Sequence, residues 1–83
     1  MGGINVTRNP YSTDILTRHY LADFVRSCRT ELRDNGKATT RENTARLMAQ
    51  EALKEESLFA GISSEAQGYA RRGREYANYL LRS

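Results

Sequence analysis

Cysteine is nearly absent from this chain of 83 residues, since Cys28 is the only one. A single cysteine cannot form an internal disulfide, and it favours a reducing compartment. No apolar run approaches the roughly 20 residues that span a membrane. The first residues also lack the charged and then apolar segments of a secretory signal. The sequence therefore predicts a cytoplasmic protein that does not contact a membrane.

The residue combinations of catalytic and metal sites are also missing. His19 is the only histidine, and no second histidine or cysteine lies one helical turn away, so a zinc site is not expected. Cys28 falls on the apolar face of its expected helix, where a thiol behaves as a small hydrophobic side chain. No glycine-rich loop leads into a helix with Lys and Ser or Thr, as a phosphate cradle would. We expect a non-enzymatic protein with no cofactor, no metal and no small-molecule substrate.

Helical periodicity dominates the rest of the chain and predicts an all-α fold, a small three-helix bundle in a single domain over residues 1–83. Residues 1–11 form an irregular lead-in, in which residues 4–7 alternate as a short strand would. The first helix is expected over 13–35, with Ser12 or Thr13 as its cap and Asn35-Gly36 at its end. One stripe of this helix carries its apolar and small side chains: Thr17, Leu21, Phe24, Val25, Cys28 and Leu32.

The second helix is expected over 39–60 and begins with a capping box between Thr39 and Glu42. Its apolar face consists of Ala45, Met48, Ala49, Ala52 and Leu53. Because Glu56 falls on that same face, the helix either ends near Glu55 or continues to Gly61, and we favour a break between them. Acidic and basic residues lie close enough late in this helix for surface ion pairs: Glu51, Glu55 and Glu56 with Arg46 and Lys54.

The third helix is expected over 64–82, with Ser63 or Ser64 as its cap and Gln67 completing a box from Ser64. Its apolar stripe contains Ala66, Tyr69, Ala70, Gly73, Tyr76, Ala77, Leu80 and Leu81. Glycine inside a helix costs about 1 kcal/mol relative to alanine, so close packing against another helix is a reason for Gly73.

Arginine accounts for eleven of the thirteen basic residues, which carry the chain to a net charge of +3. At 100° per residue, one edge of the first helix gathers Arg18, Arg26, Arg29 and Arg33, the N-terminal arginine ridge. It extends over fifteen residues, or about 22 Å. The third helix gathers Arg71, Arg74 and Arg82, the C-terminal arginine ridge, joined by Gln67 and Asn78. Folding does not require such segregation, because a mixed surface is equally soluble.

Charge is distributed unevenly along the chain. Residues 1–37 hold six basic and four acidic groups, for a net +2, and residues 61–83 hold four and two, again a net +2. Residues 38–60 hold three basic and four acidic groups, for a net −1. We therefore expect a binding face that joins the first and third helices. Arginine forks suit phosphate and carboxylate.

Two DNA-binding patterns are partly present. Residues 59–64 resemble the turn of a helix-turn-helix, but Gln67 and Gly68 stand where that motif buries an aliphatic residue. The order of a short strand and two helices loosely resembles ribbon-helix-helix, but the first helix is too long and a third helix follows. Neither pattern covers half the chain, so no family is assigned.

Two functions remain open. The first is nucleic-acid binding, as a dimer, in which the two arginine ridges with Gln67 and Asn78 grip backbone phosphates. The second is protein–protein interaction, with a second copy or another protein, through the third helix. Its anchors would be aromatic and aliphatic side chains around a glycine: Tyr69, Gly73, Tyr76 and Leu80.

Overall fold

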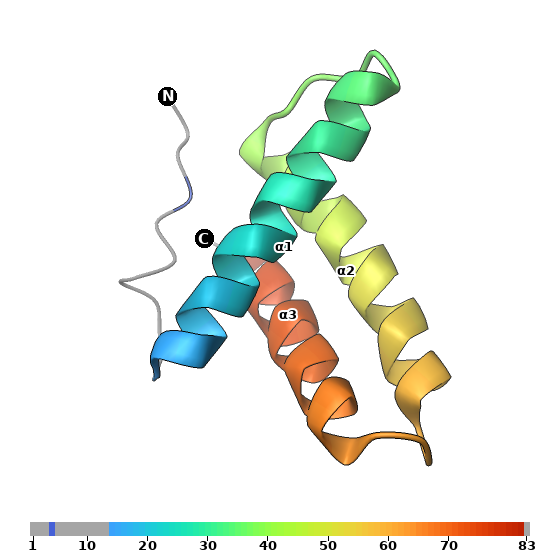
Figure 1. Cartoon of the computed structure of the whole chain (residues 1–83). Coiled ribbons are helices and arrows are strands. Elements are labelled where there is room, and N and C mark those ends of the chain that lie inside the picture. Colours follow the sequence, from blue (N-terminus) through green and yellow to red (C-terminus); the bar gives the residue numbers. More distant parts are fainter. Residues whose placement is uncertain (1–3, 5–13, 83) are drawn as a thin grey trace.

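A computed structural model describes residue 4 and residues 14–82 of the chain. Within them lie three helices, α1 (Ile15–Asp34), α2 (Arg41–Phe59) and α3 (Ser64–Arg82), and no strand. Figure 1 shows α2 and α3 side by side as a hairpin, with α1 crossing over both. The predicted all-α three-helix bundle is confirmed. The lead-in over residues 1–11, apart from residue 4, lies outside the described residues.

Asp14 caps α1. Its carboxylate accepts one hydrogen bond from the backbone N–H of Thr17 at 2.8 Å and another from the Thr17 hydroxyl at 2.9 Å. One carboxylate therefore satisfies two donors, one of them a terminal N–H of the helix. The expected cap at Ser12 or Thr13 is wrong, and both of those residues lie outside the described part of the chain.

The far end of α1 follows the prediction. The helix stops at Asp34, and Gly36 takes a φ of +70°, a left-handed conformation that glycine adopts without steric cost. The Lys37 N–H then donates to the Leu32 carbonyl at 2.8 Å, which satisfies one of the last carbonyls of the helix.

Thr40, rather than Thr39, caps α2. Its hydroxyl accepts from the backbone N–H of Asn43 at 3.1 Å, so the expected box between Thr39 and Glu42 is wrong by one residue. The helix stays continuous past Glu56 and ends at Phe59, within the window where a break was expected. At the start of α3, the Ser63 hydroxyl accepts from the Ala66 N–H at 3.2 Å, which selects Ser63 from the two proposed caps.

The core draws on all three helices. Leu21 of α1, Met48 of α2 and Tyr76 of α3 are completely buried, and Cys28 is nearly so. The close approach predicted at Gly73 is confirmed, because a Cβ atom there would lie 2.7 Å from Cε2 of Phe24. A side chain at this position would push α1 away from α3. Among the described helices, none is both long and apolar enough to cross a membrane.

Candidate functional site

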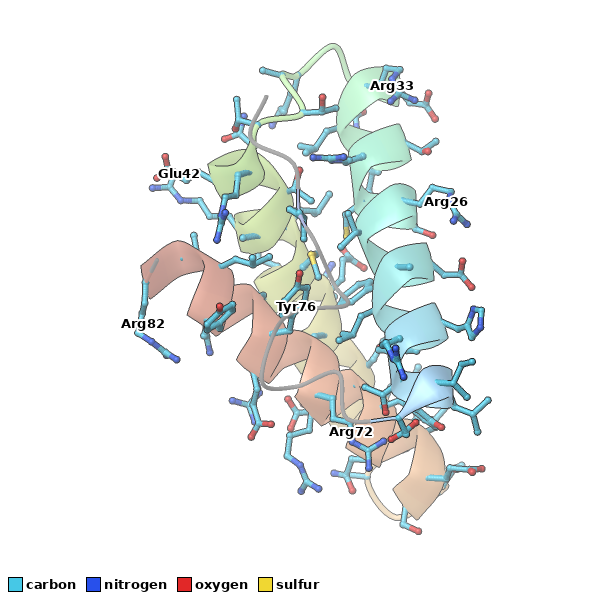
Figure 2. All side chains as sticks on the ribbon, turned by 90° about the vertical axis from the view of Figure 1, so that its left-hand side faces the viewer. Arg26, Arg33, Glu42, Arg72, Tyr76 and Arg82 are labelled. Carbon is cyan, nitrogen blue, oxygen red and sulfur yellow. The ribbon has the colours of Figure 1, made fainter. Side chains whose placement is uncertain are left out.

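The N-terminal arginine ridge lies along one edge of α1, beside the stripe that packs on the core. Figure 2 shows Arg26 and Arg33 projecting from the same side of this helix. A shallow groove of about 330 Å³ follows that edge, lined by Ala22, Val25, Arg26, Arg29, Thr30 and Arg33. Because the apolar stripe holds α1 against the hairpin, the guanidinium groups are presented on a helix of defined orientation.

Two arginines of this ridge have donors without acceptors. The Nε atoms of Arg18 and Arg29 are buried, and neither has a hydrogen-bond partner. A buried donor without an acceptor costs about 1–3 kcal/mol, so these two Nε groups contribute no hydrogen bond that stabilises the fold. Arg26 forms an ion pair with Asp23 at 2.7 Å, but the side chain of Arg26 is 73% exposed and that of Asp23 is 70% exposed. An exposed pair of this kind contributes about 0–1 kcal/mol and exchanges readily.

The C-terminal arginine ridge is arranged differently, because one of its members is engaged within the fold. Arg74 forms an ion pair with Glu56 of α2 through Nε, and its Nη2 donates to Glu56 Oε1 at 3.2 Å. This contact explains how Glu56 sits on the inner face of α2. The hydrogen bond from Arg74 is also the main reason that the pKa of Glu56 is lowered and the pKa of Arg74 is raised.

The polar residues expected beside this ridge are also partly used by the fold. The Gln67 side-chain amide donates to the Glu56 carbonyl at 3.3 Å, so it joins α3 to the end of α2 and closes no capping box from Ser64. Asn78 is half-buried, whereas Arg71 and Arg82 are exposed. Of the three arginines in the C-terminal ridge, two remain open to solvent.

The labelled arginines of the two ridges lie apart. In Figure 2, Arg26 and Arg33 lie on one side of the molecule, and Arg82 lies on the opposite side. Arg26 and Arg33 are therefore separated from Arg82, and a binding face that joins the first and third helices stays a prediction.

The interface residues proposed on the third helix lie mostly inside the chain. Gly73, Tyr76 and Leu80 are buried, with Tyr76 fully covered and Leu80 only 5% exposed. Tyr69 is half-buried against Tyr20 of α1, with ring centroids 5.3 Å apart. This face of α3 is thus already packed inside the chain, with Tyr69 and Gly73 against α1.

An acidic groove, not anticipated from the sequence, lies on the other flank of α1, between α1 and α2. It encloses about 280 Å³ and is lined by Tyr20, Asp23, Phe24, Ser27, Cys28, Glu31, Glu51 and Glu55. Burial, with the nearby carboxylates of Glu31, Glu51 and Glu55, raises the pKa of Cys28 to about 12. The sequence held two signals for it, the acidic flank of the first helix and the net negative charge of residues 38–60.

The expected surface pairs of these acids form only in part. Lys54 lies 3.5 Å from Glu51, but Arg46 pairs with Glu42 at 2.5 Å. No cation in the described part of the chain forms an ion pair with Glu31 or Glu55. Of the four carboxylates in the acidic groove, two therefore have an ion-pair partner and two, Glu31 and Glu55, have none within the described residues.

The remaining candidates fit their expected places. His19 is exposed and Cys28 is buried, as their helix positions predict. Among the residues that the structure describes, no three acidic, histidine or cysteine side chains form a metal-binding cluster. Comparison with protein-family models, curated proteins and solved structures finds no match to this chain.

Proposed function

We propose that this chain is a small, non-enzymatic module that binds the phosphate backbone of nucleic acid through the N-terminal arginine ridge. The observation that carries the proposal is the row of four arginines along one edge of α1, which includes the half-buried Arg18 and Arg29. Exposed guanidiniums of Arg26 and Arg33 flank them along the groove on α1. Phosphate oxygens are acceptors with the charge and geometry that such a row of forks requires.

The length of the ridge suits a polymeric anion better than a single one. Arg18 and Arg33 are fifteen residues apart, which places them about 22 Å apart along the helix axis. Duplex DNA carries a charge about every 1.7 Å of its axis, so a ridge of that length faces on the order of ten phosphates. Contacts to phosphate give affinity and position without reading bases, so DNA and RNA of any sequence are expected ligands.

Salt dependence provides the test. We expect a fluorescein-labelled 20-base-pair duplex to bind the full chain, with affinity falling roughly 100-fold between 50 and 200 mM salt if four phosphates are contacted. Replacing both Arg29 and Arg33 with Gln should lower the slope of log affinity against log salt by about 2. Fluorescence anisotropy measures both quantities, and a single-stranded RNA of equal length shows whether the ridge prefers one polymer.

The matched control replaces Arg46 and Lys54 of α2 with Gln. This variant loses the same charge from an exposed surface outside the ridge, so its slope should equal that of the wild type. Circular dichroism establishes that both variants remain folded. The proposal is overturned if the wild type fails to bind at 50 mM salt, or if the ridge variant and the control have equal slopes.

A further inference from the structure

The two flanks of α1 carry opposite charge. The N-terminal arginine ridge follows one edge, and the acidic groove follows the other, where Asp23 and Glu31 face Glu51 and Glu55 of α2. The same molecule therefore presents a row of guanidiniums and a groove of carboxylates on separate surfaces. From this complementarity we propose that the acidic groove is a docking site for the N-terminal arginine ridge of a second copy of this chain.

The lining of the acidic groove fits a guanidinium better than a simple cation. Besides carboxylates it includes the rings of Tyr20 and Phe24, whose centroids lie 5.7 Å apart, and arginine stacks on aromatic faces. Carboxylates beside aromatic rings are what a planar guanidinium group binds.

The two surfaces also agree in length. Arg26, Arg29 and Arg33 extend over seven residues, or about 10 Å of helix. Asp23 and Glu31, at the ends of the groove on α1, are eight residues apart, or about 12 Å. Three guanidiniums of one copy therefore match the row of carboxylates on the next.

Some carboxylates of the groove and one arginine of the ridge lack partners within a single chain, which favours their pairing between two copies. Glu31 and Glu55 have no cation paired with them in the described residues, and Arg29 retains an unpaired Nε. Docking would bring these groups together in exchange for two surface pairs, Asp23 with Arg26 and Glu51 with Lys54. Because ridge and groove are different surfaces, the contact is heterologous, so each added copy leaves one ridge and one groove free at the ends.

The test uses the full chain without nucleic acid, so its outcome is independent of phosphate binding. Sedimentation velocity at 20 mM and 500 mM salt should show association that grows with concentration at low salt and disappears at high salt. A groove variant, with Glu51 and Glu55 both changed to Gln, and a ridge variant, with Arg29 and Arg33 both changed to Gln, should each weaken association about tenfold or more. A control variant, with Glu42 and Glu65 changed to Gln, loses equal charge elsewhere and should associate as the wild type does.

Mixing the groove variant with the ridge variant gives the sharpest result. The intact ridge of the first still fits the intact groove of the second, but no further copy can add. We therefore expect a one-to-one heterodimer and no larger species. The proposal is overturned if the wild type stays monomeric at low salt, if either variant associates like the wild type, or if the mixture stays monomeric while the wild type associates.

Discussion

The arginines of α1 and those of α3 differ in what surrounds them, although both sets follow one edge of a helix. On α3, Arg74 pairs with Glu56 across the hairpin, and the guanidinium of Arg72 lies 5.1 Å from the ring centroid of Tyr69. On α1, the Nε atoms of Arg18 and Arg29 are buried without an acceptor. Arg72 and Arg74 of α3 thus contact neighbouring side chains, whereas Arg18 and Arg29 of α1 each have an Nε atom without a hydrogen-bond partner.

The difference follows from the positions of the helices. α3 packs along α2 over the largest helix–helix contact in the molecule, which brings α3 side chains to the carboxylate of Glu56. α1 crosses the hairpin (Figure 1), and the residues of α1 in the core cluster belong to its apolar stripe. Equal spacing of charge along two helices therefore does not imply an equal role. Each prediction below tests one side of this contrast.

Alkaline pH should produce the largest loss of stability, because both α1 and α3 bury side chains that must stay neutral. Burial raises the pKa of Tyr20 and of Cys28 on α1, and of Tyr76 on α3, to about 12 in each case. In the unfolded chain these groups ionise near 9 to 10. Their contribution to stability is therefore complete below pH 9 and is lost as pH rises toward 12.

Thermal melts between pH 8 and 12, followed by circular dichroism, measure this loss. Changing Cys28 to Ala removes the group with the lowest unfolded pKa, so the decline should then begin nearer pH 10. Melting temperatures that stay constant to pH 12 would contradict the burial of these groups.

Substitution of Gly73 should have the next largest effect, since this position sets the distance between α1 and α3. Gly73→Leu places side-chain atoms where Phe24 Cε2 already lies 2.7 Å from an ideal Cβ, and overpacking of this kind costs about 3 kcal/mol. Thermal denaturation should show a melting temperature lower by roughly 10 °C or more. The control is Gly68→Ala, where no atom lies within 4 Å and helix propensity predicts a gain of up to about 1 kcal/mol. Equal effects at the two glycines would refute the close approach.

Breaking the ion pair on α3 should have a smaller effect. Arg74→Met leaves Glu56 partly buried without its partner, with an expected cost of roughly 1–2 kcal/mol in urea denaturation. A double variant that adds Glu56→Leu removes the unpaired carboxylate and should recover most of that loss. The exposed pair of Arg46 and Glu42 is the control, because Glu42→Gln there should change stability by less than about 0.5 kcal/mol. If the double variant is no more stable than Arg74→Met, the unpaired carboxylate of Glu56 is not the cause of the lost stability.

Acid should weaken the same contact. The hydrogen bond from Arg74 lowers the pKa of Glu56 below that of the unfolded chain, so its stabilisation is present above the unfolded pKa. That stabilisation is lost as pH falls through the folded pKa. In denaturation between pH 2 and 7, Glu56→Gln should therefore reduce the loss of unfolding free energy that the wild type shows toward low pH.

The sequence predicts those features that depend on one helix at a time. The N-terminal arginine ridge and the core stripe follow from 100° per residue, and Gly73 follows from its place on an apolar stripe. The pair of Glu56 and Arg74 was not predicted, because it joins residues eighteen positions apart and depends on how α2 and α3 are turned toward each other. The available signal was the carboxylate of Glu56 on an apolar face, because a buried carboxylate requires a cationic partner.

The caps of α1 and α2 and the acidic groove were not predicted correctly from the sequence, the caps for a local reason and the groove for a tertiary one. Adjacent Ser, Thr and Asp residues all cap helices, so spacing alone cannot choose between Thr39 and Thr40. The acidic groove requires the positions of two helices relative to each other, which local periodicity does not contain. Its carboxylates were visible in the sequence as two separate acidic segments.

The smallest effect on stability is expected for Arg29 of α1, for which we propose a role in binding, and this experiment is the counterpart of the one on Arg74. Arg29→Met keeps an unbranched stem against α1 and removes a buried Nε that has no acceptor, so stability should stay within about 0.5 kcal/mol of the wild type or rise. Urea denaturation of Arg29→Met and Arg74→Met under one set of conditions makes the comparison direct. A loss at Arg29 equal to that at Arg74 would mean that the N-terminal arginine ridge also serves the fold. Stability that is unchanged, with binding lost, would assign Arg29 to recognition.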